Sequence, residues 1–377
     1  MKPTELHDQL LMLLLEKNLD EQKKEEVVSL INNEWMDWEK FLGKAFFNRV
    51  NGKIYDNIVQ FDKVPREVMI NLEMTHNAQI ERVQEQKKII NMISSLFMEN
   101  DVRHAFLKGS VLNTIVYPEG ERISNDTDIL ISSKDINKVT KLLEEQGFVQ
   151  GYYDRQLGKI VEASKKKKIF IRSSTHELCS FVRLEDSRFY KINTIDINIK
   201  LSVGDTLEAT EYMLDNVNVI QKNDVTLTTL NWNCFFVQLA SHLYREACLV
   251  TKIIAGSDMH MYKFYDFYVL LTSEDIKLDW EQIYEICKEY NQFESVYYAM
   301  YCVSTLFDGV IDSAVLAKFK PEDTRYIDQY KGKINTGEVY DWTDSFEKRF
   351  FDYRRKIEAS KNVKELSKQY DKSLDEL

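Results

Sequence analysis

The sequence predicts an α+β fold in which a small mixed β-sheet core lies between two helical regions. Proline and glycine are scarce, with 4 and 12 among 377 residues, which favours long helices. Helical spacing of apolar residues dominates both ends of the chain, whereas short strand-like runs cluster in the middle. We therefore predict a helical N-terminal region over 1–100, a small mixed α/β core over 101–225 and a helical C-terminal domain over 226–377.

The composition limits the classes of function. Hydrophobic residues make up 44% of the chain, which is enough for a substantial core. The formal net charge of −11 opposes general nucleic-acid binding, because neutralisation of phosphates dominates the affinity of such proteins. A local basic patch is still compatible with binding one nucleotide. The oligomeric state is left open.

Cysteine usage and the N-terminus bear on the compartment. The five cysteines are scattered and contain no Cys-x-x-Cys pair, as expected for reduced thiols. The apolar run Leu10–Leu15 is too short to span a bilayer and follows the acidic residues Glu5 and Asp8. We therefore expect no membrane segment and a cytoplasmic location.

The N-terminal region is expected to end in one long amphipathic helix. Apolar residues recur there at helical spacing, namely Ile80, Val83, Ile90, Ile93 and Phe97. Pro65 suits the first turn of such a helix, and Asn100 marks its approximate end. Gly52 is expected to interrupt the shorter helices that come before.

The core is expected to contain several short strands, a short helix over 111–116 and one longer helix. Strands are predicted over 102–107 and 127–131, with further strands beginning near 148, 169 and 178. A helix is predicted over 134–146, followed by Gly147 as its C-terminal cap. The clearest strand is 192–201, where isoleucine and leucine alternate with Asp196, Asn198 and Lys200.

The C-terminal domain is expected to be helical. Asn231 is a candidate cap for a helix that runs to about Ala247, and residues 261–272 form a second, aromatic-rich candidate. The remainder also shows helical spacing. The stretch from about Lys356 is highly charged and is expected to fray.

Two aspartates in the core suggest a metal site. Asp126 and Asp128 are two residues apart, so on a strand their carboxylates point to the same side. Such close like charges require compensation, and a divalent cation with a preference for oxygen ligands, such as Mg²⁺, provides it. Asp196 stands on the polar side of its alternating strand and joins the pair if the two strands are neighbours.

Three converging carboxylates are a suitable set for phosphoryl chemistry. They can hold two metal ions, which stabilise the attacking and leaving oxygens of an in-line displacement. Asp196 is also the natural base for an acceptor hydroxyl. Gly109 permits close approach of the backbone to a phosphate, and Ser110 supplies a hydroxyl at a predicted helix start. Taken alone, Asp-x-Asp is equally typical of an exposed turn, so the order of the elements carries the argument.

The motifs resemble those of a known family. The runs Phe106–Ser110, Tyr117–Pro118, Arg122 and Asp126–Ile131 are similar to motifs of the bacterial uncharacterised nucleotidyltransferase group within the DNA polymerase beta superfamily. The resemblance extends over roughly residues 65–275. It implies that Gly109 and Ser110 hold a triphosphate, that Asp126 and Asp128 bind Mg²⁺, and that Asp196 completes the metal site and activates the acceptor.

The sequence departs from the motif pattern of this family at two places. The gap between Ser110 and Asp126 is longer than in the compact superfamily motif, although a Tyr-Pro insertion is usual in this group. Asn198 stands where related proteins often carry histidine, which leaves the role of that position open. Neither departure affects the carboxylates.

Other charged residues are candidates for contacts with the nucleotide. Lys108 is expected either to contact a phosphate or to pair with the aspartates, and Arg122 either to order the motif loop or to bind the triphosphate. Lys200 shares the polar face of Asp196 and is a candidate phosphate partner. Lys263 and Asp266 are three residues apart on a predicted helix, where they can pair or bind substrate.

Two further features have a simple structural interpretation beside the functional one. His242 fits a core histidine better than a ligand. The run Lys165–Lys168 fits a solvated hairpin tip, and its functional alternative is a flap over phosphates or an acidic acceptor.

The leading hypothesis is a magnesium-dependent nucleotidyltransferase. It would move a nucleoside monophosphate from an NTP such as ATP to an acceptor hydroxyl with release of pyrophosphate, using two Mg²⁺ ions for which Mn²⁺ can substitute. A small molecule or a peptide natural product is the favoured acceptor. The alternatives are an enzyme that modifies protein or RNA, a non-catalytic nucleotide-binding protein that keeps the fold, and a helical scaffold with an exposed Asp-x-Asp loop.

Overall fold

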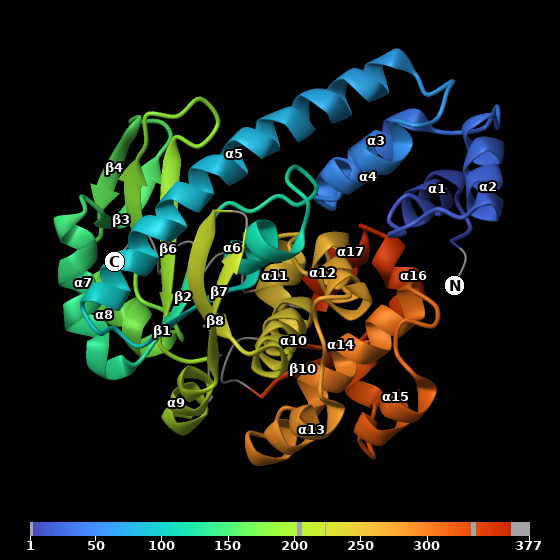
Figure 1. Cartoon of the computed structure of the whole chain (residues 1–377). Coiled ribbons are helices and arrows are strands. Elements are labelled where there is room, and N and C mark those ends of the chain that lie inside the picture. Colours follow the sequence, from blue (N-terminus) through green and yellow to red (C-terminus); the bar gives the residue numbers. More distant parts are fainter. Residues whose placement is uncertain (1–2, 202–205, 223, 333–336, 363–377) are drawn as a thin grey trace.

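The computed structural model describes residues 3–201, 206–222, 224–332 and 337–362. It confirms the predicted α+β class, with a mixed sheet surrounded by many helices. Figure 1 shows the sheet on one side, the N-terminal helices on the other, and the C-terminal helices below them. Within the described residues, no helix has both the length and the apolar character required to cross a membrane.

The N-terminal region is helical. Its helices are α1 (Leu6–Leu13), α2 (Glu21–Ile31), α3 (Trp38–Phe47), α4 (Asn51–Ile58) and α5 (Arg66–Glu99). The long helix α5 follows Pro65, as the sequence predicts, and connects the small helices to the sheet (Figure 1). The expectation for Gly52 was wrong, because Gly52 lies inside α4, and the chain instead turns at Arg49 with a φ of 55°.

The sheet contains eight strands in the order β4-β3-β5-β6-β2-β1-β8-β7. The strands are β1 (His104–Leu107), β2 (Thr127–Ile131), β3 (Val149–Asp154), β4 (Lys159–Glu162), β5 (Phe181–Leu184), β6 (Ile192–Asn198), β7 (Val217–Lys222) and β8 (Val225–Leu230). The pairs β2–β6 and β1–β8 are parallel, and the other neighbours are antiparallel. The strand predicted over 192–201 is present as β6, and it ends three residues earlier, at Asn198.

Helices connect the strands. They are α6 (Lys108–Val111), the π-helix η1 (Leu112–Val116), the 3₁₀-helix η2 (Ser133–Asp135), α7 (Ile136–Glu145), α8 (Lys165–Ser174) and α9 (Leu207–Asp215). The predicted strand near 169 was wrong, because residues 169–171 belong to α8. Ser164 explains the difference, since its Oγ accepts a hydrogen bond of 3.1 Å from the Lys167 backbone N–H and caps the helix.

The C-terminal domain is mainly helical. It contains α10 (Trp232–Cys248), α11 (Val250–Ile254), α12 (Met261–Thr272), α13 (Trp280–Glu289), α14 (Phe293–Leu306), α15 (Ser313–Phe319), the 3₁₀-helix η3 (Arg325–Asp328), β9 (Gln329–Lys331), β10 (Val339–Asp341), α16 (Phe346–Phe351) and α17 (Arg355–Asn362). Asn231 caps α10 as predicted, accepting a bond of 2.9 Å from the Cys234 N–H. The hairpin β9–β10 has no counterpart among the predictions.

One continuous apolar core joins the three regions. It runs from Leu10 in α1 through Phe97 and Phe106 to Phe264 in α12 and Phe350 in α16. Each fully buried side chain of this kind contributes about 1.5–3 kcal/mol to the free energy of unfolding. The helical regions thus pack on the sheet and share one core with it.

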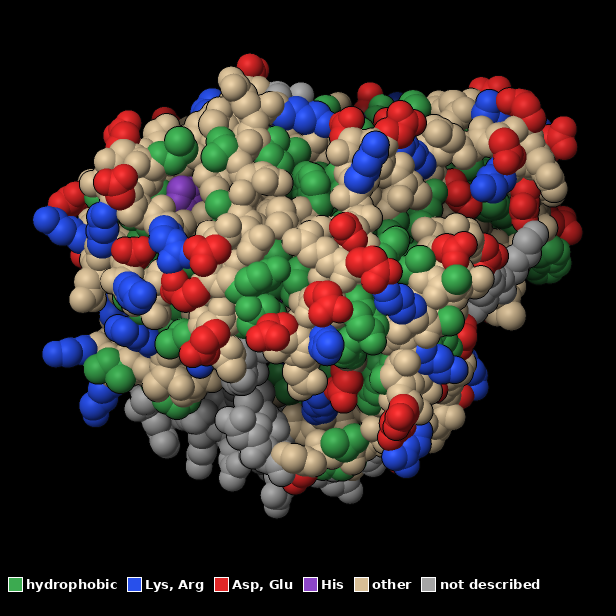
Figure 2. All heavy atoms as spheres, turned by 60° about the horizontal axis from the view of Figure 1, so that its bottom comes forward, with side chains coloured by type: hydrophobic (Ala, Val, Ile, Leu, Met, Phe, Trp, Pro, Cys, Tyr) green, Lys and Arg blue, Asp and Glu red, His purple; other side chains and the backbone are tan. Residues whose placement is uncertain are grey.

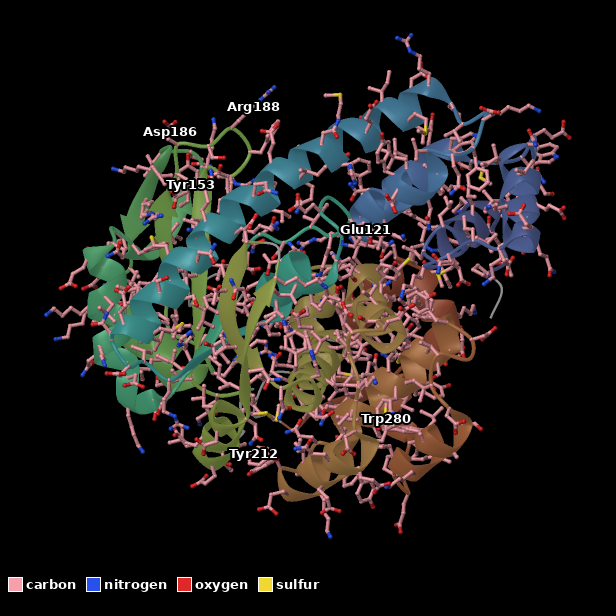
Figure 3. The ribbon with its side chains drawn as sticks, in the orientation of Figure 1. Glu121, Tyr153, Asp186, Arg188, Tyr212 and Trp280 are labelled. Atoms are coloured by element: carbon pink, nitrogen blue, oxygen red, sulfur yellow. The ribbon has the colours of Figure 1, made fainter. Side chains whose placement is uncertain are left out.

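The contact between α4 and the loop before β2 is unusually close. A Cβ at Gly52 would lie 2.1 Å from the Gly120 carbonyl oxygen and 2.5 Å from that of Glu121. Beside it, Lys53 Nζ lies 3.1 Å from Glu121 Oε1, and both side chains are buried. Figure 3 shows Glu121 where this loop meets the N-terminal helices. Only glycine fits position 52.

Gly52→Ala is expected to destabilise the chain by roughly 1–3 kcal/mol or more, because the added methyl must push backbone apart. Gly43→Ala is the matched control. Gly43 lies in α3 with nothing within 4 Å of its Cβ position, so alanine there should stabilise the chain by about 0.5–1 kcal/mol. Urea unfolding measures both. Equal effects of the two substitutions would contradict the assigned contact.

Candidate active site

The site is built on two neighbouring parallel strands. Asp128 on β2 pairs in register with Asp196 on β6, so the two side chains lie side by side on one face of the sheet. The intervening residues Ile129, Ile195 and Ile197 face the other way and are fully buried. Asp126 directly precedes β2 and is half-buried. The register thus brings Asp128 and Asp196 together, and Asp126 lies near enough for its charge to raise the pKa of both.

A lysine partly compensates these charges. Lys108 Nζ lies 2.6 Å from Asp128 Oδ1, at the point where β1 ends and α6 begins. The Lys108 backbone has a φ of 47°, in the left-handed region that non-glycine residues rarely adopt. Such a conformation is retained only where the surroundings enforce it, and it is common at functional sites.

The pKa values of the buried Asp128 and the half-buried Asp196 are raised. Burial is the main cause for Asp128, where the charge of Asp126 adds to it and Lys108 opposes it, giving a pKa of about 6. Burial also dominates for Asp196, and the charges of Asp128 and Asp126 raise its pKa further, to about 7. Ser180 Oγ donates a 2.6 Å hydrogen bond to Asp196 Oδ1 and limits this rise. The raised pKa values reflect a concentration of negative charge that a cation would relieve.

The Gly109-Ser110 turn holds the strand ends. The fully buried Ser110 Oγ donates to the backbone carbonyl of Leu107 at 3.0 Å, with a second, longer contact to that of Asp128. A hydroxyl contact to phosphate, as expected from the sequence, is not available in this arrangement. A Cβ at Gly109 would meet Ser124 Oγ at 2.4 Å, so the motif loop packs directly on its backbone.

Two predicted nucleotide contacts pair with each other. Arg122 makes a two-pronged ion pair with Asp266, with Nε–Oδ1 and Nη2–Oδ2 distances of 2.7 and 2.8 Å. Tyr117 donates to the same carboxylate at 2.9 Å. All three side chains are buried, and together they fasten the motif loop to α12. The structure thus gives Arg122 and Asp266 a structural partner, and their contact with a nucleotide stays a prediction.

The remaining predicted cations, Lys263 and Lys200, lie in different surroundings. Lys263 lies in α12, where its Nζ contacts Glu246 Oε2 at 2.7 Å and the Asp258 carbonyl oxygen at 2.9 Å. Burial lowers the pKa of Lys263, which Glu246 opposes. Lys200 lies beyond the end of β6 and is half-buried, so it does not continue the polar face of that strand.

A polar cavity of about 250 Å³ opens beside the aspartates. Its lining includes Asp126 and Asp128 together with cations from three other parts of the chain. These cations are Arg49 after α3, Lys252 in α11 and Lys263 in α12. Asp196 stands outside this lining, on the side of Asp128 that faces Ser180. The two sides of Asp128 are therefore chemically different.

Several residues of the cavity were not found from the sequence. Arg49 lies with its guanidinium 5.5 Å from the centre of the Tyr262 ring, and Glu246 is shared by Lys252 and Lys263. His242, expected in the core, lines the cavity, and burial lowers its pKa well below the usual value. Its position one turn before Glu246 on α10 was a usable helical-spacing signal. Nothing in the sequence near Arg49 indicated its role.

The donor set is suited to magnesium, though it does not form a complete cage. Every candidate ligand is a carboxylate oxygen, which is the chemistry Mg²⁺ prefers. Among the residues that the structure describes, no three Asp, Glu, His or Cys side chains are arranged as a ready metal site. Magnesium commonly binds through one or two carboxylates together with substrate phosphates, so phosphate oxygens would complete its shell.

Comparison with known proteins gives one result. A family model described as "Uncharacterised nucleotidyltransferase" matches residues 34–308, which is more than half of the chain. The matched region contains the sheet, the three aspartates and α12. A search of curated proteins found no match.

The raised pKa of Asp196 predicts a pH-dependent stability. Because the folded pKa of about 7 exceeds the usual value near 3.9, the folded chain favours the neutral carboxyl. The stability it contributes is fully present below about pH 4 and is lost as the pH rises through about 7. Asp196→Asn should therefore become more stable than the wild type by roughly 2 kcal/mol or more across this range.

Urea unfolding with a chelator present, repeated from about pH 4 to pH 8, measures this difference. Asp186→Asn is the control, because Asp186 is exposed at the far β5–β6 turn, as Figure 3 shows. A difference for Asp196→Asn that does not change with pH would contradict the burial of its charge.

Proposed function

The chain belongs to the uncharacterised nucleotidyltransferase family, and from this premise we propose that it transfers a nucleoside monophosphate from an NTP to an acceptor hydroxyl in a magnesium-dependent reaction. The observation that carries the proposal is the register that sets Asp128 beside Asp196 with Asp126 close by. Nucleotidyl transfer itself follows from the family. The metal, the nucleotide and the acceptor are the proposed part.

The cavity suits the triphosphate. Its cations Arg49, Lys252 and Lys263 line the same polar space as Asp126 and Asp128, so negative phosphates bound there would contact positive side chains and a carboxylate-bound cation. Lys252 keeps 43% of its side-chain exposure, which leaves it room to reorient toward a ligand. Binding here would hold the reacting phosphorus next to Asp128.

Magnesium would be held by Asp126, Asp128 and Asp196, and it would supply positive charge to the phosphate oxygens as negative charge develops on them. Mn²⁺ is expected to substitute. Lys108, which neutralises Asp128 here, has a flexible side chain that can move to a phosphate oxygen when a cation takes over this task.

The reaction at the acceptor side needs a base. The acceptor hydroxyl oxygen would form a bond to the α-phosphorus while the bond from that phosphorus to the bridging oxygen breaks and pyrophosphate leaves. The hydroxyl proton would pass to the Asp196 carboxylate. Asp196, in register beside Asp128, is the carboxylate placed to accept this proton. A small molecule or a peptide is the favoured acceptor.

Asp128→Asn is expected to lower label transfer from radioactive NTP by at least about 10³-fold, because it removes a central ligand of the proposed cation. The assay combines Mg²⁺, labelled NTPs and candidate acceptors, and Asp186→Asn serves as the control. Transfer that survives in Asp128→Asn would contradict the assigned metal site. Metal-dependent NTP binding in calorimetry without turnover on any acceptor would instead favour a binding protein.

A further inference from the structure

Helix α8 is an exposed, basic and partly apolar element at the edge of the sheet. None of its residues is buried. Ile169 and Phe170 are 59% and 46% exposed, which is high for large apolar side chains. The run Lys165–Lys168 forms its first turn, and it is therefore not the hairpin tip expected from the sequence. A helix of this kind gains little from packing, so its composition points to a partner.

The charges of α8 are arranged unfavourably for an isolated helix. The N-terminal turn of a helix favours acidic residues, yet this one carries four lysines and no acid. Lys168 pairs with Glu162 at 2.8 Å and Lys167 lies 5.0 Å from the centre of the Tyr152 ring. Lys165 and Lys166 have no carboxylate partner in the described part of the chain. An anionic ligand would relieve this repulsion.

This concentration of positive charge contrasts with the net charge of −11 for the whole chain. Figure 2 shows Lys and Arg side chains projecting from the margin where α8 lies in Figure 1, with Asp and Glu side chains among them. The surface around α8 is thus complementary to a short anionic segment, whereas the remainder would repel a long one.

The sheet connects α8 to the acceptor side of the site. Ser180 Oγ bonds to Asp196, the Ser180 backbone carbonyl accepts from Gly151 N–H at 2.9 Å, and Gly151 pairs in register with Glu162. Residues directly opposite one another on neighbouring strands point to the same face. Glu162, the partner of Lys168, therefore shares the face that carries Asp196.

The strip between Asp196 and α8 is short. Its register positions hold only the small residues Ser180 and Gly151, and Gly151 is buried against the backbone of Val161. Three strand spacings separate Asp196 on β6 from Glu162 on β4, which is about 14 Å. An extended chain of about four residues spans that distance.

We propose that the acceptor is a hydroxyl-bearing polypeptide segment whose acidic and apolar residues bind α8 while the hydroxyl, about four residues away, reaches Asp196. This inference rests on the proposed transfer reaction and adds the class of acceptor. The net charge of −11 opposes a nucleic-acid acceptor, and the exposed aliphatic side chain of Ile169 offers an apolar contact that suits a polypeptide and contributes nothing to base or phosphate recognition.

The test uses fluorescent peptides in which a stretch of glutamates and leucines lies about four residues from one serine. Anisotropy without nucleotide measures binding to the full chain. Lys165→Glu with Lys166→Glu should weaken binding about tenfold or more, and added salt should weaken it in the wild type. The charge-matched control is Lys138→Glu with Lys141→Glu on the exposed face of α7, which should bind as the wild type does.

Label transfer measures which spacing between the acidic stretch and the serine the enzyme prefers. Serine about four residues from the acidic stretch should be the best acceptor, and serine directly beside it or far from it should be poor. The inference is overturned if the α8 variant binds the peptide normally, if a glutamine-substituted peptide binds equally well, or if an oligonucleotide or a second copy of the chain occupies α8 in preference. A wild-type chain that shows no Mg²⁺-dependent binding of NTP would instead overturn the proposed reaction, whatever the result for peptide binding.

Discussion

The in-register parallel pairing of β2 with β6 is the constraint on which the site depends. Side chains alternate along a strand, so a shift of one residue would turn Asp196 into the core and bring Ile195 to the open face. The fully buried isoleucines on both strands oppose such a shift, because it would expose them. The apolar core thus determines where two like charges meet, and burial there makes them costly unless a cation is near.

The surroundings of the aspartates divide into a rigid part and an adjustable part. Arg122 and Asp266 hold each other in a buried, two-pronged pair that fixes the motif loop to the C-terminal domain. Breaking such a pair usually costs several kcal/mol. Lys108, by contrast, meets Asp128 through a single flexible side chain. The buried ion pair therefore holds the motif loop in place, whereas the Lys108 side chain can move when a substrate adds charge.

Local patterns were sufficient to predict much of the fold. Alternation over 192–201 predicted both the strand that the structure has over 192–198 and the face of Asp196, and Asn231 predicted the start of α10, because such signals depend on neighbouring residues. The run Ile169–Ile171 misled, since apolar and β-branched residues suggest a strand where the Ser164 cap selects a helix. Pairs between distant segments, such as Arg122 with Asp266, could not be predicted, nor could the place of Arg49 in the cavity wall. The roles of the site residues remain predictions.

The tight contact at Gly52 affects the mechanics of the cavity. Backbone meets backbone there, so no side chain can rearrange to absorb a displacement between α4 and the loop that leads to β2. Arg49 lies just before α4, and Asp126 follows that loop. This contact therefore fixes the position of Arg49 relative to Asp126. An inserted residue on either side of it would change the width of the cavity.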